Sequence, residues 1–69
     1  MAIINTKYKI IVWKNVKTTK WEGLLRVYNN LGEQFDLKFA PYFDTKAEAL
    51  RYGSLMLIDK GVDWEEEER

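Results

Sequence analysis

Residues 43–61, FDTKAEALRYGSLMLIDKG, are the stretch that decides the fold of this chain, because they alone read as a helix. Thr45 followed by Glu48 forms a T-x-x-E capping box, in which side chains bind the free backbone N–H groups at a helix start. Gly61 accepts the left-handed conformation that ends many helices. These signals predict an α-helix over residues 46–60.

Apolar and small side chains recur along this helix at spacings of three and four, which predicts a stripe facing the core. The stripe comprises Ala47, Leu50, Ser54, Leu57 and Ile58. Ala49, Tyr52 and Met56 then fall on the opposite side. Scattered apolar surface is normal and needs no explanation. The alternative is a second contact surface for a partner protein or a second copy of the chain.

Three segments before the helix are rich in β-branched and aromatic residues and read as strands: residues 8–14 (YKIIVWK), 21–28 (WEGLLRVY) and 33–39 (EQFDLKF). The first strand can begin as early as Ile3. Residues 15–20 and 29–32 are polar or carry turn residues, so they predict hairpin loops. Gly23 is a candidate β-bulge.

Short connections between consecutive strands predict an antiparallel arrangement. The expected fold is therefore α+β, a three-stranded antiparallel meander with one C-terminal helix packed on one face. Residues 1–62 are expected to form a single domain, and residues 63–69 are expected to form a flexible acidic tail. An alternative for the tail is that it folds over the sheet as a mimic of a polyanion, anchored by Trp64.

The net charge of zero conceals a division along the chain. Residues 1–30 carry six basic and one acidic side chain, whereas residues 31–69 carry five basic and ten acidic ones. Such asymmetry is a recognised hint of a polyanionic partner or of an acidic tail.

Strand alternation sorts the side chains onto two faces of the sheet. The helix side is expected to receive Tyr8, Ile10, Val12, Trp21, Leu25, Val27, Phe35, Leu37 and Phe39. The outward side is expected to display Lys9, Ile11, Trp13, Leu24, Arg26, Tyr28 and Lys38. Glu22 and Asp36 also fall on this side, where they are expected to pair with Arg26 and Lys38 across the strands. A bulge at Gly23 would reverse the faces of Trp21 and Glu22.

Aromatic rings among basic side chains are typical of a nucleic-acid platform, because rings stack on bases and cations neutralise phosphates. The sequence thus predicts DNA or RNA binding through five residues: Lys9, Trp13, Arg26, Tyr28 and Lys38. The alternative is a protein-interaction module, including a homodimer, that uses Ile11, Leu24, Tyr52 and Met56. The outward apolar residues can also be covered by residues 1–5 or by the tail.

The junction YFDTKAEA, residues 42–49, resembles the F-x-T-K-x-E-A sheet-to-helix junction of arm-site DNA-binding domains. Those are the small N-terminal domains of phage-type tyrosine integrases. The resemblance implies a three-stranded sheet with one helix. It also implies DNA contact through the outward sheet face, here Lys9, Trp13, Arg26, Tyr28 and Lys38.

The chain has no histidine and no cysteine, so the commonest general base and the thiol nucleophile are missing. Its four glycines are isolated and form no phosphate-binding loop. We therefore expect a non-enzymatic protein without metal or cofactor. No apolar run reaches the roughly 20 residues of a membrane span, and no signal-peptide pattern is seen, so a cytoplasmic protein without membrane contact is expected.

Overall fold

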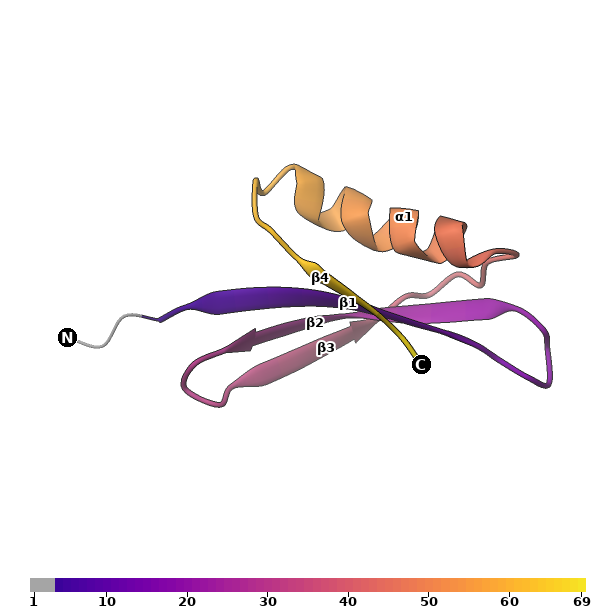
Figure 1. Cartoon of the computed structure of the whole chain (residues 1–69), viewed down its shortest axis with the longest axis horizontal. Helices are drawn as coiled ribbons and strands as arrows, with labels where there is room; N and C mark the ends of the chain where they lie inside the picture. Colours follow the sequence, from indigo (N-terminus) through magenta and orange to yellow (C-terminus); the bar gives the residue numbers. More distant parts are fainter. Residues whose placement is uncertain (1–3) are drawn as a thin grey trace.

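The computed structural model describes residues 4–69 and shows a small α+β domain with one helix and a four-stranded sheet (Figure 1). Its elements are β1 (Thr6–Lys14), β2 (Trp21–Asn29), β3 (Gln34–Lys38), α1 (Lys46–Ile58) and β4 (Glu65–Glu68). The order across the sheet is β3-β2-β1-β4. In Figure 1 the helix lies on one side of the sheet, and no other described element covers the opposite side.

The three predicted strands are present and form the antiparallel meander. Thr6 pairs with Asn29 and Lys14 with Trp21, and every intervening residue of β1 has a partner in β2. The described part of β1 begins at Thr6, and the earlier start at Ile3 lies outside the described residues. Within residues 4–69, no helix has the length and apolarity that crossing a membrane requires.

The predicted bulge at Gly23 is wrong, because Gly23 pairs regularly with Val12. The glycine serves a close approach instead. A Cβ atom at this position would lie 2.8 Å from the Phe39 ring, which packs over the strand. Since the register is unbroken, Trp21 stays on the helix side and Glu22 on the outward side.

The predicted helix forms over a slightly shorter range. The Thr45 hydroxyl accepts a hydrogen bond from the Glu48 backbone N–H at 3.2 Å, which confirms Thr45 as the N-cap. The helix ends at Ile58, with Asp59 as the C-cap, so residues 59 and 60 lie beyond it. Gly61 has a φ of 65°, as its expected role at the helix end requires.

The predicted rotation of the helix is wrong in part: Leu50 and Leu57 pack at the core as expected, but the buried side of the helix is centred elsewhere. Ala49, Gly53 and Leu57 are buried, and Tyr52 and Met56 pack against the core beside them. Two residues of the predicted stripe, Ala47 and Ile58, are exposed. The physical reason is the contact at Gly53, where the missing side chain lets Ile10 of β1 lie directly against the helix backbone. Tyr52 is turned inward and its ring packs against those of Phe39 and Phe43.

The strand faces of β1 and β2 agree with the alternation. Ile10, Val12 and Leu25 are buried beneath α1, and Tyr8, Trp21 and Val27 pack around them. The third strand differs in one respect. Phe39 is buried, but Phe35 and Leu37 are exposed although they share its side of the sheet. The helix packs on β1 and β2 and leaves these two side chains uncovered.

Residues 65–68, expected in a flexible tail, form β4 and pair with β1 in parallel, with Lys9 opposite Glu65 and Val12 opposite Glu68. The domain thus has a fourth strand that the prediction lacked. Trp64 packs against the core just before the strand. Lys46 at the start of α1 forms an ion pair of 2.6 Å with Glu68. An aromatic anchor and opposite charges on neighbouring elements therefore hold this acidic segment against the sheet.

Candidate functional site

The sheet face opposite α1 is called the open face here, and it contains every residue predicted to bind nucleic acid. Directly paired residues point to the same side of a sheet. The registers therefore place four strands' side chains on it: Lys7, Lys9, Ile11 and Trp13 of β1, Glu22, Leu24, Arg26 and Tyr28 of β2, Gln34, Asp36 and Lys38 of β3, and Glu65 and Glu67 of β4. The sequence identified the basic and aromatic members and two of the four carboxylates, Glu22 and Asp36, but it did not place Glu65 and Glu67 here.

Lys9 lies between two carboxylates of β4. Its Nζ atom is 3.9 Å from Glu65 Oε2 and 3.6 Å from Glu67 Oε1. The same ammonium group lies 5.9 Å from the centroid of the Tyr28 ring, within the range of a cation–π contact. A phosphate approaching Lys9 therefore meets the negative charge of β4 at the same place.

Arg26 is paired across the strands with Asp36. Its Nε donates a hydrogen bond to Asp36 Oδ1 at 2.9 Å, and its Nη2 donates one to Asp36 Oδ2 at 3.1 Å. This bidentate hydrogen bond lowers the pKa of Asp36 and raises that of Arg26. The two guanidinium nitrogens of Arg26 that could bind a phosphate are therefore already bound to a carboxylate of the same chain.

Lys38 contacts Glu22, the one charged side chain of the described residues that is buried. Glu22 Oε1 lies 3.3 Å from Lys38 Nζ, and Glu22 Oε2 accepts a hydrogen bond of 2.7 Å from Asn15 Nδ2. The bond from Asn15 is the main cause of a lowered Glu22 pKa, and Lys38 adds to it, while burial opposes both. The carboxylate thus stays ionised and satisfied in a half-enclosed position.

The apolar side chains of the open face are only partly accessible. Ile11 has 0% exposure, although no described element lies over it. Its direct neighbours in the register are Leu24 and Glu67. Trp13, Leu24 and Tyr28 are half-buried. Of the four residues predicted for a protein interface, Ile11 is therefore inaccessible, and Tyr52 and Met56 pack inward at the helix.

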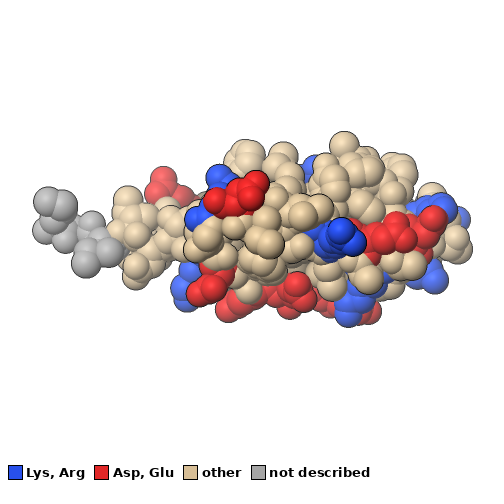
Figure 2. All heavy atoms as spheres, turned by 90° about the horizontal axis from the view of Figure 1, so that it is seen from above, with Lys and Arg blue, Asp and Glu red and all other residues tan. Residues whose placement is uncertain are grey.

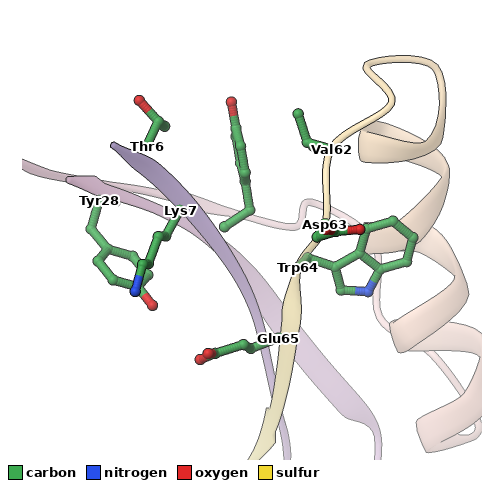
Figure 3. Close-up of a pocket in the computed structure, with 8 residues that line it drawn as sticks. Thr6, Lys7, Tyr28, Val62, Asp63, Trp64 and Glu65 are labelled. Carbon is green, nitrogen blue, oxygen red and sulfur yellow. The ribbon is translucent and has the colours of Figure 1, made fainter. Parts of the chain in front are cut away.

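A hollow of about 410 Å³ lies where β1 and the segment leading into β4 diverge. Figure 3 shows Lys7 and Tyr28 on one side of this fork and Val62 and Trp64 on the other. Asp63 and Glu65 point in opposite directions, so the charged groups do not converge on one point. We assign no ligand to this hollow. Within residues 4–69, no cluster of carboxylates is grouped as a metal site would require.

Comparison with known proteins gives no relative. The chain matches no protein-family model, and no curated protein or solved structure matches it. The resemblance of residues 42–49 to arm-site DNA-binding domains therefore stays a prediction. What the chain binds has to be argued from its own surfaces.

The second surface is one of the two edges of the sheet, the other being β4; it is called here the β3 edge and is made of Gln34–Lys38. No other described strand pairs with its outer side. Phe35 is 64% exposed and Leu37 is 42% exposed on the helix side of this strand. The sequence predicted their face correctly but not their exposure, because strand alternation does not tell how far a helix reaches across a sheet.

The helix-side surface does not carry charges of one sign only. Figure 2, seen from that side, shows acidic and basic side chains interspersed around a wide uncharged area. The two surfaces thus differ in kind. Three of the four cations of the open face, Lys9, Arg26 and Lys38, are already paired with carboxylates, whereas the β3 edge carries exposed apolar side chains and unused backbone groups.

Proposed function

We propose that this chain is a non-enzymatic protein-binding module that accepts an extended segment of a partner along its β3 edge. The observation that carries the proposal is an edge strand with two exposed apolar side chains, Phe35 and Leu37. Strand addition to such an edge is a common mode of peptide recognition, in which backbone hydrogen bonds give affinity and alternate side chains give specificity.

The alternation of backbone hydrogen bonds along β3 indicates which of its N–H and C=O groups are not used by β2. Phe39 N–H donates to the Gly23 carbonyl at 2.8 Å, and the Glu33 carbonyl accepts from Asn29 N–H at 3.1 Å. In an antiparallel ladder, alternate residues point their backbone groups to the same neighbour. Odd-numbered residues of β3 therefore bind β2, and the backbone groups of the even-numbered residues Gln34, Asp36 and Lys38 face outward.

The edge has few of the features with which proteins block such pairing. Proline, bulges and inward-pointing charges protect many edge strands. β3 contains no proline, and its charged residues Asp36 and Lys38 point to the open face, where they pair with Arg26 and Glu22. Pro41 lies past the end of the strand. An added strand can thus bind without displacing a charge.

The test is an NMR titration of the ¹⁵N-labelled chain with a synthetic strand. The probe is an end-capped eight-residue peptide that alternates valine and threonine, added in large molar excess. We expect amide shifts concentrated at Gln34, Asp36 and Lys38, because their N–H groups acquire hydrogen bonds. A saturating response that changes little between low and high salt supports a backbone and apolar contact.

The matched control is the same peptide with proline at its two central positions, which cannot complete the ladder. We expect it to leave the β3 amides unchanged. Equal shifts with both peptides, or shifts only outside β3, would overturn the proposal.

The second candidate function is nucleic-acid binding through the open face, favoured by one observation. Trp13 and Tyr28 are half-buried aromatic residues of the open face, and Lys7 on the same face forms no ion pair with any described residue. The paired state of Lys9, Arg26 and Lys38 weighs against it, because phosphates must compete with Glu22, Asp36, Glu65 and Glu67.

A titration with a short DNA duplex and a short single strand tests this candidate. Binding is expected to shift Trp13 and Tyr28 and to weaken steeply as salt is raised. The absence of shifts at low salt would exclude nucleic-acid binding by the open face without affecting the proposal for the β3 edge.

A further inference from the structure

We propose that the partner of the β3 edge is a second copy of this chain, bound antiparallel about a twofold axis that passes between the two Leu37 residues. This inference rests on the proposed function, since it uses the same edge. It adds the identity of the partner and the register. The product is a symmetric dimer with one continuous sheet and both helices on the same side.

The alternation of outward-facing backbone groups along β3 limits the registers in which two copies can pair. The outward backbone groups belong to even-numbered residues, so an even-numbered residue of one copy must lie opposite an even-numbered residue of the other. A twofold axis at Leu37 satisfies this condition and places Asp36 of each copy opposite Lys38 of the other. These two pairs would exchange roughly four backbone hydrogen bonds.

Charge then selects among the permitted registers. With the axis at Asp36, the two Asp36 carboxylates would face each other, and with the axis at Lys38, the two ammonium groups would. With the axis at Phe35, Asp36 would lie opposite Gln34 and gain no charged partner. Like charges directly opposite each other destabilise a sheet and opposite charges stabilise it. Among these four registers, only the axis at Leu37 pairs opposite charges.

The same register continues the charge pattern of the open face. Within one copy, Glu22 already lies 3.3 Å from Lys38, and Arg26 binds Asp36 at 2.9 Å. Joining Lys38 to the second copy's Asp36 produces a row of alternating signs across the interface: Glu22, Lys38, then Asp36 and Arg26 of the second copy. No charge has to leave its present partner.

The helix side of the interface joins the exposed apolar residues. Leu37 meets its own symmetry mate, and Phe35 lies opposite the second copy's Phe39. Phe39 is the buried ring that contacts Tyr52 at a centroid distance of 4.9 Å. The exposed Phe35 ring would thus lie at the margin of an existing aromatic cluster and be removed from water.

Cysteine crosslinking tests both the dimer and its register, because the chain contains no cysteine of its own. Leu37→Cys places the two thiols on directly opposed residues, within the 4.4–6.8 Å Cα separation that a disulfide needs. Phe35→Cys is the matched variant on the same strand and face. Its two thiols would lie four residues apart along the strands, about 13 Å. Leu55→Cys, on an exposed position of α1, measures random collisions.

We expect the Leu37→Cys chain to form a disulfide-linked dimer at least tenfold faster than the other two variants under mild oxidation. Faster crosslinking of Phe35→Cys would overturn the register. Equal rates for all three would overturn the dimer.

Sedimentation equilibrium of the unmodified chain gives an independent measurement. We expect the apparent mass to rise with concentration from 8.2 kDa toward twice that value. Leu37→Lys should keep the mass at 8.2 kDa, since it brings two ammonium groups together at the axis, whereas Leu55→Lys should not. Leu37 is already partly exposed, so the variant is expected to fold, which far-UV circular dichroism checks. A chain that stays monomeric while its β3 edge binds the valine–threonine peptide would refute this inference and leave the proposed function intact.

Discussion

Gly53 of α1 lies directly against Ile10 of β1. A Cβ atom at Gly53 would come within 2.9 Å of two side-chain carbons of Ile10, closer than real Cβ contacts occur. Ile10 is fully buried, so it has little room to move away. This one contact brings the helix backbone close to the sheet and determines which side of α1 faces the core.

Gly53→Ala is expected to destabilise the domain despite the better helix propensity of alanine. Alanine is favoured over glycine in a helix by about 1 kcal/mol, but overpacking a tight core costs about 1–3 kcal/mol. We expect a net loss in the free energy of unfolding, measured by urea denaturation. Ile10→Val in the Gly53→Ala background should recover part of the loss, because the two residues are in contact. If Gly53→Ala raised the free energy of unfolding, the Ile10 side chain would have to move aside at little cost.

Thr19→Gly is expected to stabilise the domain. Thr19, in the loop between β1 and β2, has a φ of 59°, which is unfavourable for a β-branched residue. Glycine adopts this conformation freely, and the left-handed region costs other residues about 1–2 kcal/mol. After allowance for the greater freedom of glycine in the unfolded chain, we expect a gain of about 1 kcal/mol or less by urea denaturation. An unchanged or lower free energy of unfolding would contradict the idea that the positive φ of Thr19 strains the backbone.

Acid is expected to weaken the domain through Glu22 and Asp36. The pKa of each carboxyl is lowered in the folded chain, from ordinary values of 4.5 and 3.8. Their contribution to stability is therefore fully present above the ordinary pKa and is lost as the pH falls through the lowered one.

Glu22→Gln should lower the unfolding midpoint at pH 7, because the amide NH2 group that replaces one carboxylate oxygen cannot accept a hydrogen bond from Asn15 or Lys38, and the charge that pairs with Lys38 is lost. The difference between the variant and the original chain should shrink as the pH falls below about 4.5. Thermal unfolding followed by circular dichroism measures both chains. A difference that stays constant down to pH 2 would show that Glu22 acts through packing and not through its charge.

If the open face binds nucleic acid, removing the carboxylates of β4 should strengthen that binding. The double change Glu65→Gln and Glu67→Gln frees Lys9 from both partners and should raise affinity roughly threefold or more at low salt. Glu48→Gln with Asp59→Asn is the matched control, since it changes the net charge equally, in α1 and at its C-cap. Fluorescence anisotropy of a labelled single strand measures both. Equal gains from the two variants would show a general charge effect and not a role of β4.

The parts of the fold that depend on local chemistry could be predicted from the sequence. The N-cap at Thr45, the positive φ of Gly61 and the alternation along β1 and β2 each follow from a few neighbouring residues. The rotation of α1 could not be predicted, because apolar residues occur around much of the helix. The deciding contact joins Gly53 to a residue 43 positions earlier in the chain.

The fourth strand was also beyond local reasoning. Four successive glutamates have low strand propensity and repel one another. They pair with β1 because Lys9 and Lys46 lie on either side and because Trp64 anchors the segment. The basic and aromatic residues of the open face were placed correctly. The pairing of Arg26 and Lys38 with Asp36 and Glu22 was predicted and is confirmed. The pairing of Lys9 with Glu65 and Glu67 was not predicted, because it depends on the fourth strand.

The parallel pairing of β1 with β4 has a consequence for biosynthesis. During translation, β1 finds its outer neighbour β4 only after β2, β3 and α1 have been made. Until then, the outer side of β1 is an unpaired edge that β4 covers in the finished domain. Chaperone contact or premature association during translation should therefore concentrate on the side of β1 that Glu65–Glu68 later occupy.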